Sequence, residues 1–400
     1  MSRPTVLRRA ATRFALFGCL FLGITTMPLF SQSTNEVETL TRLFEAGAQE
    51  LSYSSQFQAA VSPGQLEQLV GQIEGQLGTF ATVEGTSNPY TVVFEQGTVT
   101  ARITLDGDGR ITGLRFTELT PTSGTLDEAI ERVEQIEGQT SLFIRRNGET
   151  IVATNTDEAL AVGSSFKLAV LAAVDEAIAE GGLRWDSVVS FERSWRSLPS
   201  GILQDWPEGS SLTIETLSTL MISLSDNTAT DALISIVGRG AVEQYAPRNS
   251  PFLKTAEAFR LKNPENNDLL SEYRAGSEDE RRTLVDRLAD RPLPEHSLFE
   301  GEPVAPDVEW FFTTAELADL IERLDHLDLM TVNPGVARPA EWERIAYKGG
   351  SEPGIMNLTT TLLDAERTRY TVSLTVNRDN AALNEPEVFT AYQAILNALQ

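Results

Sequence analysis

The chain has 400 residues, of which 41% are hydrophobic and 22% are charged, and its formal net charge is −25. This length and composition are typical of a globular protein of two or three domains that buries a substantial core. The negative charge argues against nucleic acid and anionic membrane surfaces as partners, because both would repel it. We interpret the charge as a solvated acidic surface that aids solubility.

Residues 1–33 predict a secretory signal peptide. Four arginines precede an apolar run at residues 14–30, and no acidic residue occurs before Glu36. A basic segment followed by an apolar one is typical of such signals. We therefore expect an extracytoplasmic protein, periplasmic or secreted, that contacts a membrane only if this segment is not cleaved. Cys19 is the only cysteine and lies in the signal, so the mature chain is expected to have neither a disulfide nor a cysteine-ligated metal.

Residues 35–120 predict a small α+β domain, separated from the rest by a Pro-Thr-Ser-Gly linker. Two amphipathic helical patterns come first, and alternating apolar residues then indicate strands. An Asp-Gly-Asp-Gly turn joins the last two strands. No pair of acids or histidines indicates catalysis here, so we expect this domain to serve docking or stabilisation. The expected helices are 38–51 and 63–77, and the expected strands are 90–94, 98–105 and 111–118.

Residues 125–400 predict a second, larger domain with a buried helix at 164–180. Two strands precede a long helical region and three strands follow it. This order predicts a five-stranded, mainly antiparallel sheet with a helical lobe inserted between its second and third strands. The expected helices are 126–137, 213–224, 228–237, 278–290, 314–324 and 387–399, and the expected strands are 141–146, 150–154, 345–348, 357–364 and 370–377.

Three short motifs in this domain carry the candidate chemistry. Ser164 and Lys167 are three residues apart on a helix, so the lysine amine can reach the serine hydroxyl and act as its base. A Ser-Asp-Asn turn at 225–227 adds a second hydroxyl and an amide. A Lys-Gly-Gly-Ser segment at 348–351 adds a positive charge and lets a substrate backbone approach closely. Each motif also has a plain interpretation: Ser164 as a helix N-cap, the second as a turn with an N-cap, and the third as a turn.

In this order the motifs resemble those of the penicilloyl-serine transferase superfamily, which includes class A serine β-lactamases and D-alanyl-D-alanine peptidases. The resemblance covers about residues 125–400 and extends to the Ser-Gly-Ile-Leu segment at 200–203 and to the two threonines at 313–314. The sequence has no cluster of metal ligands, and we expect neither a metal nor a cofactor. The roles that the resemblance implies are Ser164 as nucleophile, Lys167 as its base, Ser225 as proton relay, Asn227 as ligand of the substrate amide, Lys348 as ligand of a carboxylate, and Gly350 and Ser351 as substrate-binding residues, with the N–H groups of Ser164 and Ser351 as the oxyanion hole.

Two departures from the class A pattern affect the expected kinetics. The Glu-x-x-Leu-Asn stretch that supplies the deacylating base is missing, although Glu257 and Glu265 lie at about the right distance along the chain. We therefore expect β-lactams to acylate the enzyme and to leave slowly, unless one of these acids folds into the site. In addition, Gly349 replaces a hydroxyl-bearing residue, and Ser351 is the candidate to compensate.

The small first domain and the long segment 249–308 resemble the two-domain β-lactamase-like esterase encoded in clavulanic acid biosynthesis clusters, whose first domain has a steroid-isomerase-like fold. The expected function is that of a secreted serine hydrolase acting on β-lactams or related acyl esters and amides through a Ser164 acyl-enzyme. The alternatives are a penicillin-binding or sensor protein with little turnover and a D-alanyl-D-alanine peptidase. A Ser-His-Asp hydrolase is excluded, because no Gly-x-Ser-x-Gly elbow accompanies His296 and His326.

Overall fold

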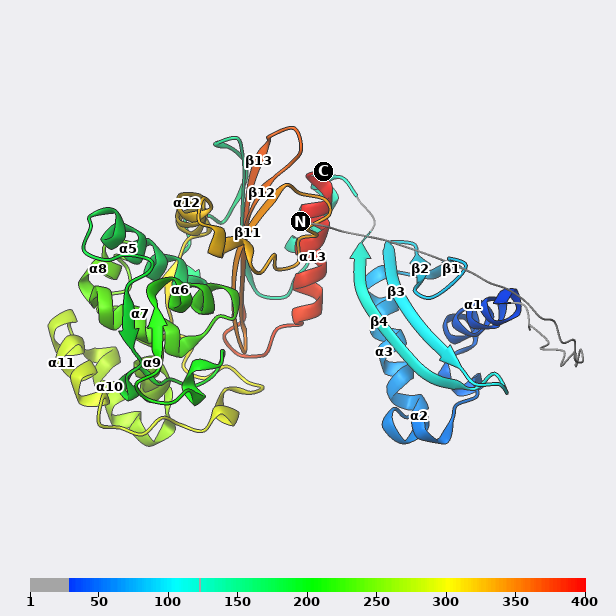
Figure 1. The fold of residues 1–400 in the computed structure, drawn as a ribbon, viewed down its shortest axis with the longest axis horizontal. Helices are drawn as coiled ribbons and strands as arrows, with labels where there is room; N and C mark the ends of the chain where they lie inside the picture. Colours follow the sequence, from blue (N-terminus) through cyan, green and yellow to red (C-terminus); the bar gives the residue numbers. More distant parts are fainter. Residues whose placement is uncertain (1–28, 122–123) are drawn as a thin grey trace, which may run out of the picture. The chain divides into compact units, whose positions relative to one another are not determined.

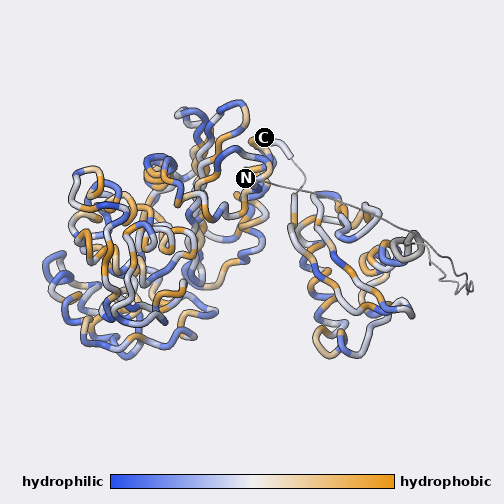
Figure 2. The backbone as a smooth tube through the Cα atoms, in the orientation of Figure 1, coloured by the Kyte–Doolittle hydropathy of each residue, from blue (hydrophilic) through white to orange (hydrophobic). Residues whose placement is uncertain are grey.

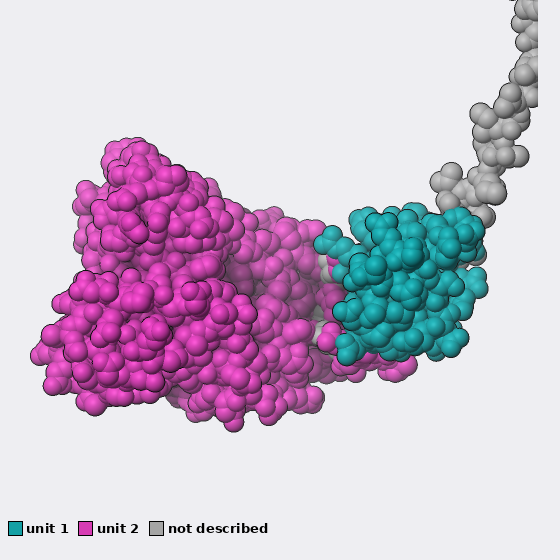
Figure 3. All heavy atoms as spheres, turned by 90° about the horizontal axis from the view of Figure 1, so that it is seen from below, with its two compact units in different colours: residues 1–70, 82–92, 100–116 teal, residues 71–81, 93–99, 117–400 magenta. Residues whose placement is uncertain are grey.

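The computed structural model describes residues 29–121 and 124–400, so most of the expected signal peptide and Cys19 lie outside the described residues. The chain divides into two compact units, residues 1–70, 82–92 and 100–116 in one and residues 71–81, 93–99 and 117–400 in the other (Figure 3). The second unit thus takes in two segments that the sequence assigned to the first domain, and the boundaries 35–120 and 125–400 stay a prediction. Among the described helices, none combines the length and the apolar character needed to cross a membrane.

The N-terminal elements form helices and one sheet, as expected for an α+β fold (Figure 1). Alternate residues of β2 are buried, which fits a strand with one face on a core. Strand β1 was not expected, and the likeness to a steroid isomerase stays a prediction. The elements are α1 (Leu29–Ala46), α2 (Ser55–Ala60), α3 (Pro63–Leu77), β1 (Phe80–Glu84), β2 (Tyr90–Phe94), β3 (Gly97–Leu105) and β4 (Ile111–Pro121), with the sheet in the order β1-β2-β3-β4.

The larger unit contains a five-stranded sheet in the order β11-β12-β13-β5-β6, antiparallel at every pairing. Strands β5 and β6 precede the helical lobe and the other three follow it, so the predicted architecture is confirmed. Figure 1 shows α13 on one side of this sheet and α12 on the other, which explains why β12 and β13 are buried along almost their whole length. The strands are β5 (Gln139–Arg146), β6 (Glu149–Thr154), β11 (Arg344–Glu352), β12 (Ile355–Leu363) and β13 (Arg369–Asn377), and the flanking helices are α4 (Leu126–Glu134), α12 (Thr314–Leu324) and α13 (Glu385–Ala398).

Helix α5 (Lys167–Ala179) is the centre of the helical lobe. Its residues 168–174 are each at most 2% exposed, because the sequence there is apolar on every face. Figure 2 shows hydrophobic segments running through the lobe and the sheet, with hydrophilic segments in the loops around them. The other helices of the lobe are α6 (Ile214–Ser223), α7 (Asn227–Val237), α8 (Arg239–Glu243), α9 (Thr255–Lys262), α10 (Asn267–Ala275) and α11 (Glu278–Leu288).

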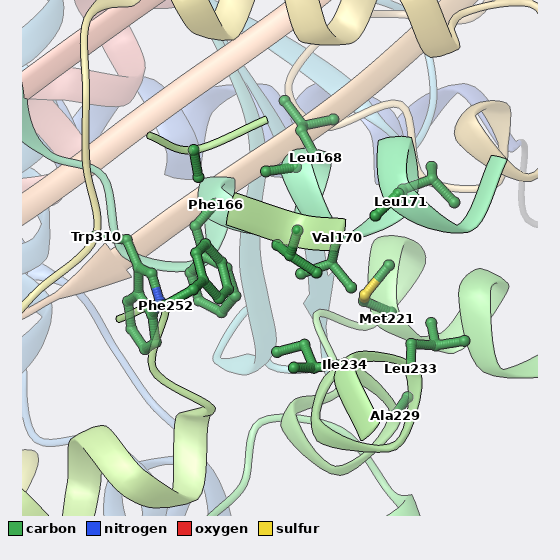
Figure 4. Packing of buried hydrophobic residues seen from close by; sticks show 14 of the residues in the cluster. Phe166, Leu168, Val170, Leu171, Met221, Ala229, Leu233, Ile234, Phe252 and Trp310 are labelled. Atoms are coloured by element: carbon green, nitrogen blue, oxygen red, sulfur yellow. The ribbon is translucent and has the colours of Figure 1, made fainter. Parts of the chain in front are cut away.

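An aromatic cluster fixes the start of this central helix. Phe166 stacks on Trp310 with ring centroids 3.9 Å apart and meets Phe252 edge-on at 5.7 Å. Figure 4 shows the three rings together beside α5. The Trp310 indole also donates a hydrogen bond to the carbonyl of Leu253, at 3.1 Å. Because Phe166 lies between Ser164 and Lys167, its packing holds both of these residues in place.

Candidate active site

Ser164 lies in a short 3₁₀ turn, Gly163–Phe166, that leads into α5. Lys167 Nζ donates a hydrogen bond to Ser164 Oγ at 2.9 Å. The capping positions of the turn and of α5 are Val162 and Phe166, and neither makes a side-chain cap. The hydroxyl of Ser164 is therefore engaged by Lys167 rather than used as a helix cap, which favours the catalytic interpretation over the plain one.

The amine of Lys167 is fully buried and meets only neutral oxygens among its hydrogen-bond acceptors. Besides Ser164, it donates to the carbonyl of Ser225 at 2.5 Å, to Ser225 Oγ at 3.1 Å and to Asn227 Oδ1 at 2.7 Å. Burial, followed by the nearby charge of Lys348, lowers the pKa of Lys167 well below its ordinary value. A neutral amine can accept a proton, so the geometry suits Lys167 to the role of general base.

The residues of the Ser-Asp-Asn turn have two kinds of role, one in the fold and one at the candidate active site. Ser225 adopts a left-handed backbone conformation, with φ of 56°, and its carbonyl accepts a hydrogen bond from Ser200 Oγ at 2.6 Å. Asn227 donates through Nδ2 to the carbonyl of Leu198 at 3.1 Å, which orients its amide oxygen towards Lys167. Ser225 and Asn227 therefore face the Ser164 centre, as the sequence predicts.

Asp226 has the purely structural part of this motif. The carboxylate is fully buried and caps α7 by accepting a hydrogen bond from the Ala229 N–H at 2.8 Å. Its other oxygen accepts from the N–H groups of Ile202 and Leu203 at 2.7 and 2.9 Å. The turn-and-cap interpretation thus holds for Asp226, while its two neighbours serve the site.

Strand β11 brings the third motif against the serine turn. Lys348 Nζ donates to Ser225 Oγ at 3.0 Å, and burial lowers the pKa of Lys348 to about 7. A Cβ at Gly350 would lie 2.3 Å from the backbone nitrogen of Ser164 and 2.2 Å from the carbonyl oxygen of Val162. Only glycine therefore lets β11 pass this close, and the position of Gly350 brings the backbone of Ser351 beside the nucleophile.

Tyr347 is a site residue that the sequence reasoning missed. A Cβ at Gly349 would lie 2.1 Å from Tyr347 Oη, so the tyrosine hydroxyl fills the space of the missing side chain. It lines a cavity of about 300 Å³ together with Ser164, Ser225 and Lys348. Residues two apart share one face of a strand, and this spacing was the available signal. Tyr347, rather than Ser351, places a hydroxyl where Gly349 has none.

Ser164 also opens onto a second cavity, of about 480 Å³. Its apolar part includes four aromatic side chains, and its polar part includes the side chains of Asn227, Thr255 and Ser351. The aromatic lining residues are Phe166, Phe259, Phe299 and Trp310, and the titratable ones are His296, Glu352 and Glu385.

The two acids that the sequence offered as a deacylating base are not in either cavity. Glu257 forms an ion pair with Arg239 at 2.8 Å and accepts a hydrogen bond from the Lys254 N–H at 2.7 Å, at the start of α9. Glu265 is exposed in a 3₁₀ turn. Neither residue lines a cavity that contains Ser164.

Comparison with known proteins agrees with the motifs. Residues 125–286 match the model of a family described as the β-lactamase enzyme family. This segment carries Ser164, Lys167, Ser225 and Asn227, whereas Lys348 lies beyond it. Over this segment the match agrees with the predicted resemblance to the serine β-lactamase and penicillin-binding superfamily. The sequence matches none of the curated proteins with which it was compared.

Several solved structures overlay on about two thirds of the chain. A β-lactamase from Sphaerobacter thermophilus is 22% identical, with 69% of this chain and 95% of that chain covered and a TM-score of 0.49. A class A β-lactamase from Mycobacterium abscessus is 18% identical, with 68% and 96% covered and a TM-score of 0.46. A protein named PBP-A is 15% identical, with 68% and 94% covered and a TM-score of 0.46. Likeness at this level carries no argument about function.

Proposed function

We propose that the protein is an extracytoplasmic serine hydrolase that cleaves acyl esters or amides, β-lactams included, through an acyl-enzyme on Ser164. The observation that carries the proposal is the hydrogen bond from the buried Lys167 amine to Ser164 Oγ, at 2.9 Å. The lowered pKa of Lys167 supports proton transfer from the hydroxyl to the amine. The basic and apolar segments within residues 1–33 support export.

The contacts support a complete acylation step. Lys167 takes the proton of Ser164, whose oxygen then attacks the carbonyl carbon of the substrate. The N–H groups of Ser164 and Ser351 stabilise the resulting oxyanion. Ser225 Oγ lies between the two amines, 3.1 Å from Lys167 and 3.0 Å from Lys348, and relays the proton to the leaving group. The leaving group departs and the acyl group stays on Ser164.

The linings of the two cavities define a class of substrate. The Lys348 ammonium and the Tyr347 hydroxyl form a site for a carboxylate in the smaller cavity. The aromatic side chains of the larger cavity favour an acyl group with an apolar or aromatic part. A substrate that combines a carboxylate with a bulky acyl group fits both, and β-lactams have this composition.

Labelling with a fluorescent penicillin, followed by mass spectrometry over time, tests the proposal. We expect a covalent adduct on the wild type, none on Ser164→Ala, and an acylation rate about 10²–10⁴-fold lower for Lys167→Ala. The matched control is Ser165→Ala, which removes a neighbouring buried hydroxyl that has no hydrogen-bond partner in the described part of the chain and should leave labelling intact.

Three outcomes would point away from β-lactam hydrolysis. An adduct that never decays would assign the chain to the penicillin-binding or sensor class. Release of D-alanine from a D-alanyl-D-alanine peptide, faster than hydrolysis of any β-lactam or ester, would assign it to the peptidases. The absence of an adduct on the wild type with both penicillin and small activated esters would overturn the acyl-enzyme itself.

A further inference from the structure

Strand β11 carries a second charged residue on the face that meets the nucleophile. Side chains alternate along a strand, so Lys348, Gly350 and Glu352 share one face. Gly350 packs against the backbone nitrogen of Ser164. Lys348 and Glu352 therefore flank the serine turn from opposite sides, each about 7 Å along the strand from Gly350.

The carboxylate of Glu352 is held in place at the wall of the larger cavity. Its Oε2 accepts a hydrogen bond from Lys262 Nζ at 2.7 Å, and the side chain keeps an exposure of 18%. It lines the cavity of about 480 Å³ together with Ser164 and Asn227. A side-chain hydrogen bond also joins Glu352 to Glu309. The exposed part of the Glu352 carboxyl group is open to a water molecule in the cavity.

A buried ion-pair centre behind the cavity wall supports this carboxylate. Lys262, at the end of α9, is fully buried and also forms an ion pair with Glu309. Burial and the neighbouring charge of Glu352 raise the pKa of Glu309 above its ordinary value. Lys262 contacts both carboxyl groups, that of Glu309 behind the cavity wall and that of Glu352 at the wall. Lys262 and Glu309 are positioning residues in this arrangement.

Hydrolysis of an acyl-enzyme needs a base for water on the side of the ester away from the leaving group. Lys167, Ser225 and Lys348 occupy one side of Ser164. Of the two acids that line the cavity on the other side, Glu352 and Glu385, Glu352 is the one on the strand that packs against the serine turn. We propose that Glu352 is the general base that activates the deacylating water. This inference rests on the proposed Ser164 acyl-enzyme. It supplies a base for deacylation, the step that lacks one because the acid of the class A pattern is missing.

The water oxygen bonds to the acyl carbon while one of its protons passes to the Glu352 carboxylate, and the oxyanion is held by the N–H groups of Ser164 and Ser351. The bond between the acyl carbon and Ser164 Oγ then breaks, and Ser164 Oγ takes up the proton that Glu352 received from the water, so that Glu352 returns to its carboxylate form. The product leaves as a carboxylic acid, and Lys167, which gave its proton to the leaving group in acylation, stays neutral.

Glu352→Gln tests the inference, because glutamine keeps the shape and a hydrogen-bond acceptor for Lys262 but is not a base. The measurement is a quenched-flow time course with a chromogenic cephalosporin and mass spectrometry of the Ser164 adduct. We expect acylation within about threefold of the wild type and deacylation lowered by about 10²–10⁴-fold, so that the adduct accumulates. Glu257→Gln is the matched control: it changes an acid that is also paired with a basic residue but lines neither cavity, and both rates should stay unchanged.

The outcomes separate this inference from the proposed function. A wild type that forms and hydrolyses the adduct, with unchanged deacylation in Glu352→Gln, overturns Glu352 as the base and leaves the acyl-enzyme standing. Equal losses in acylation and deacylation, in a variant whose circular dichroism and melting temperature match the wild type, also overturn it. If the wild type forms no adduct at all, the proposed function fails first and the role of Glu352 fails with it.

Discussion

Two regions of the larger unit bury lysine side chains in opposite electrostatic settings. Only four of the 32 basic residues of the chain are lysines, and Lys167, Lys262 and Lys348 are each at most 2% exposed. Lys167 and Lys348 donate hydrogen bonds to neutral oxygens, and burial lowers the pKa of both. Lys262 forms ion pairs with Glu309 and Glu352, and these carboxylates raise its pKa above the ordinary value despite complete burial.

The difference shows how one residue type serves two purposes. A buried amine without a carboxylate partner is poised to exchange protons, which suits catalysis but disfavours the folded state. A buried amine between two carboxyls stays charged, and it holds the carboxyl groups in a fixed geometry. The first region therefore performs proton transfer, while the second orients Glu352 at the cavity. Substitution of the lysines separates the two purposes.

The largest effect on stability is expected from Lys262→Met. Removing the cation leaves the buried Glu309 and the partly exposed Glu352 without their partner, and breaking a buried pair such as Lys262–Glu309 costs about 3–5 kcal/mol of unfolding free energy. Urea denaturation at pH 7 measures the change. Lys254→Met is the control, since the one hydrogen bond of the Lys254 amine within the described part of the chain is an exposed one with Ser235, and its effect should stay within about 0.5 kcal/mol. A Lys262→Met variant as stable as the wild type would show that the ion pairs contribute no net stability.

The contrast between these regions also marks the limit of the sequence analysis. Ser164 and Lys167 are three residues apart, so their meeting follows from helix geometry alone. The helices at 63–77 and 314–324 and the strand at 90–94 have the expected bounds, because proline, capping threonine and alternating apolar residues are local signals. Lys262 lies 47 residues from Glu309 and 90 from Glu352, and no local pattern brings them together.

Position along the chain misled the search for a deacylating acid. Glu257 lies at about the expected distance from the Ser-Asp-Asn turn, but it pairs with Arg239, a partner 18 residues away that periodicity does not reveal. Glu352 was not considered, because it lies one residue beyond the Lys-Gly-Gly-Ser motif. Lysine is scarce in this chain, because almost all of its basic residues are arginines. A rare lysine such as Lys262 therefore indicated an interior site, and the sequence analysis did not use this signal.

A smaller effect concerns the pH dependence of substrate capture by Lys348. Its pKa of about 7 means that the ammonium exists below this pH and is lost above it. For a penicillin, whose carboxylate needs this cation, kcat/KM should fall about tenfold per pH unit above pH 7, because kcat/KM reports the free enzyme. An activated ester without a carboxylate is the control and should not show this decline. Parallel profiles for both substrates would remove Lys348 from carboxylate binding.

The smallest effect is a gain in stability for Lys348→Met, opposite in sign to Lys262→Met. The folded-state pKa of about 7 lies below the ordinary 10.5, so the unfolded chain binds more protons between these values, and this difference disfavours folding at neutral pH. Methionine removes that penalty and keeps the packing, and we expect about 1 kcal/mol of added stability at pH 7 with loss of penicillin acylation.

The wild type gains stability through this group as the pH rises from 7 towards 10, so the advantage of the variant should shrink over that window. Urea denaturation at pH 7 and pH 9.5 measures both values. An advantage that is independent of pH would mean that the gain comes from packing rather than from removal of a buried amine, and the comparison between the two lysine regions would lose its electrostatic basis.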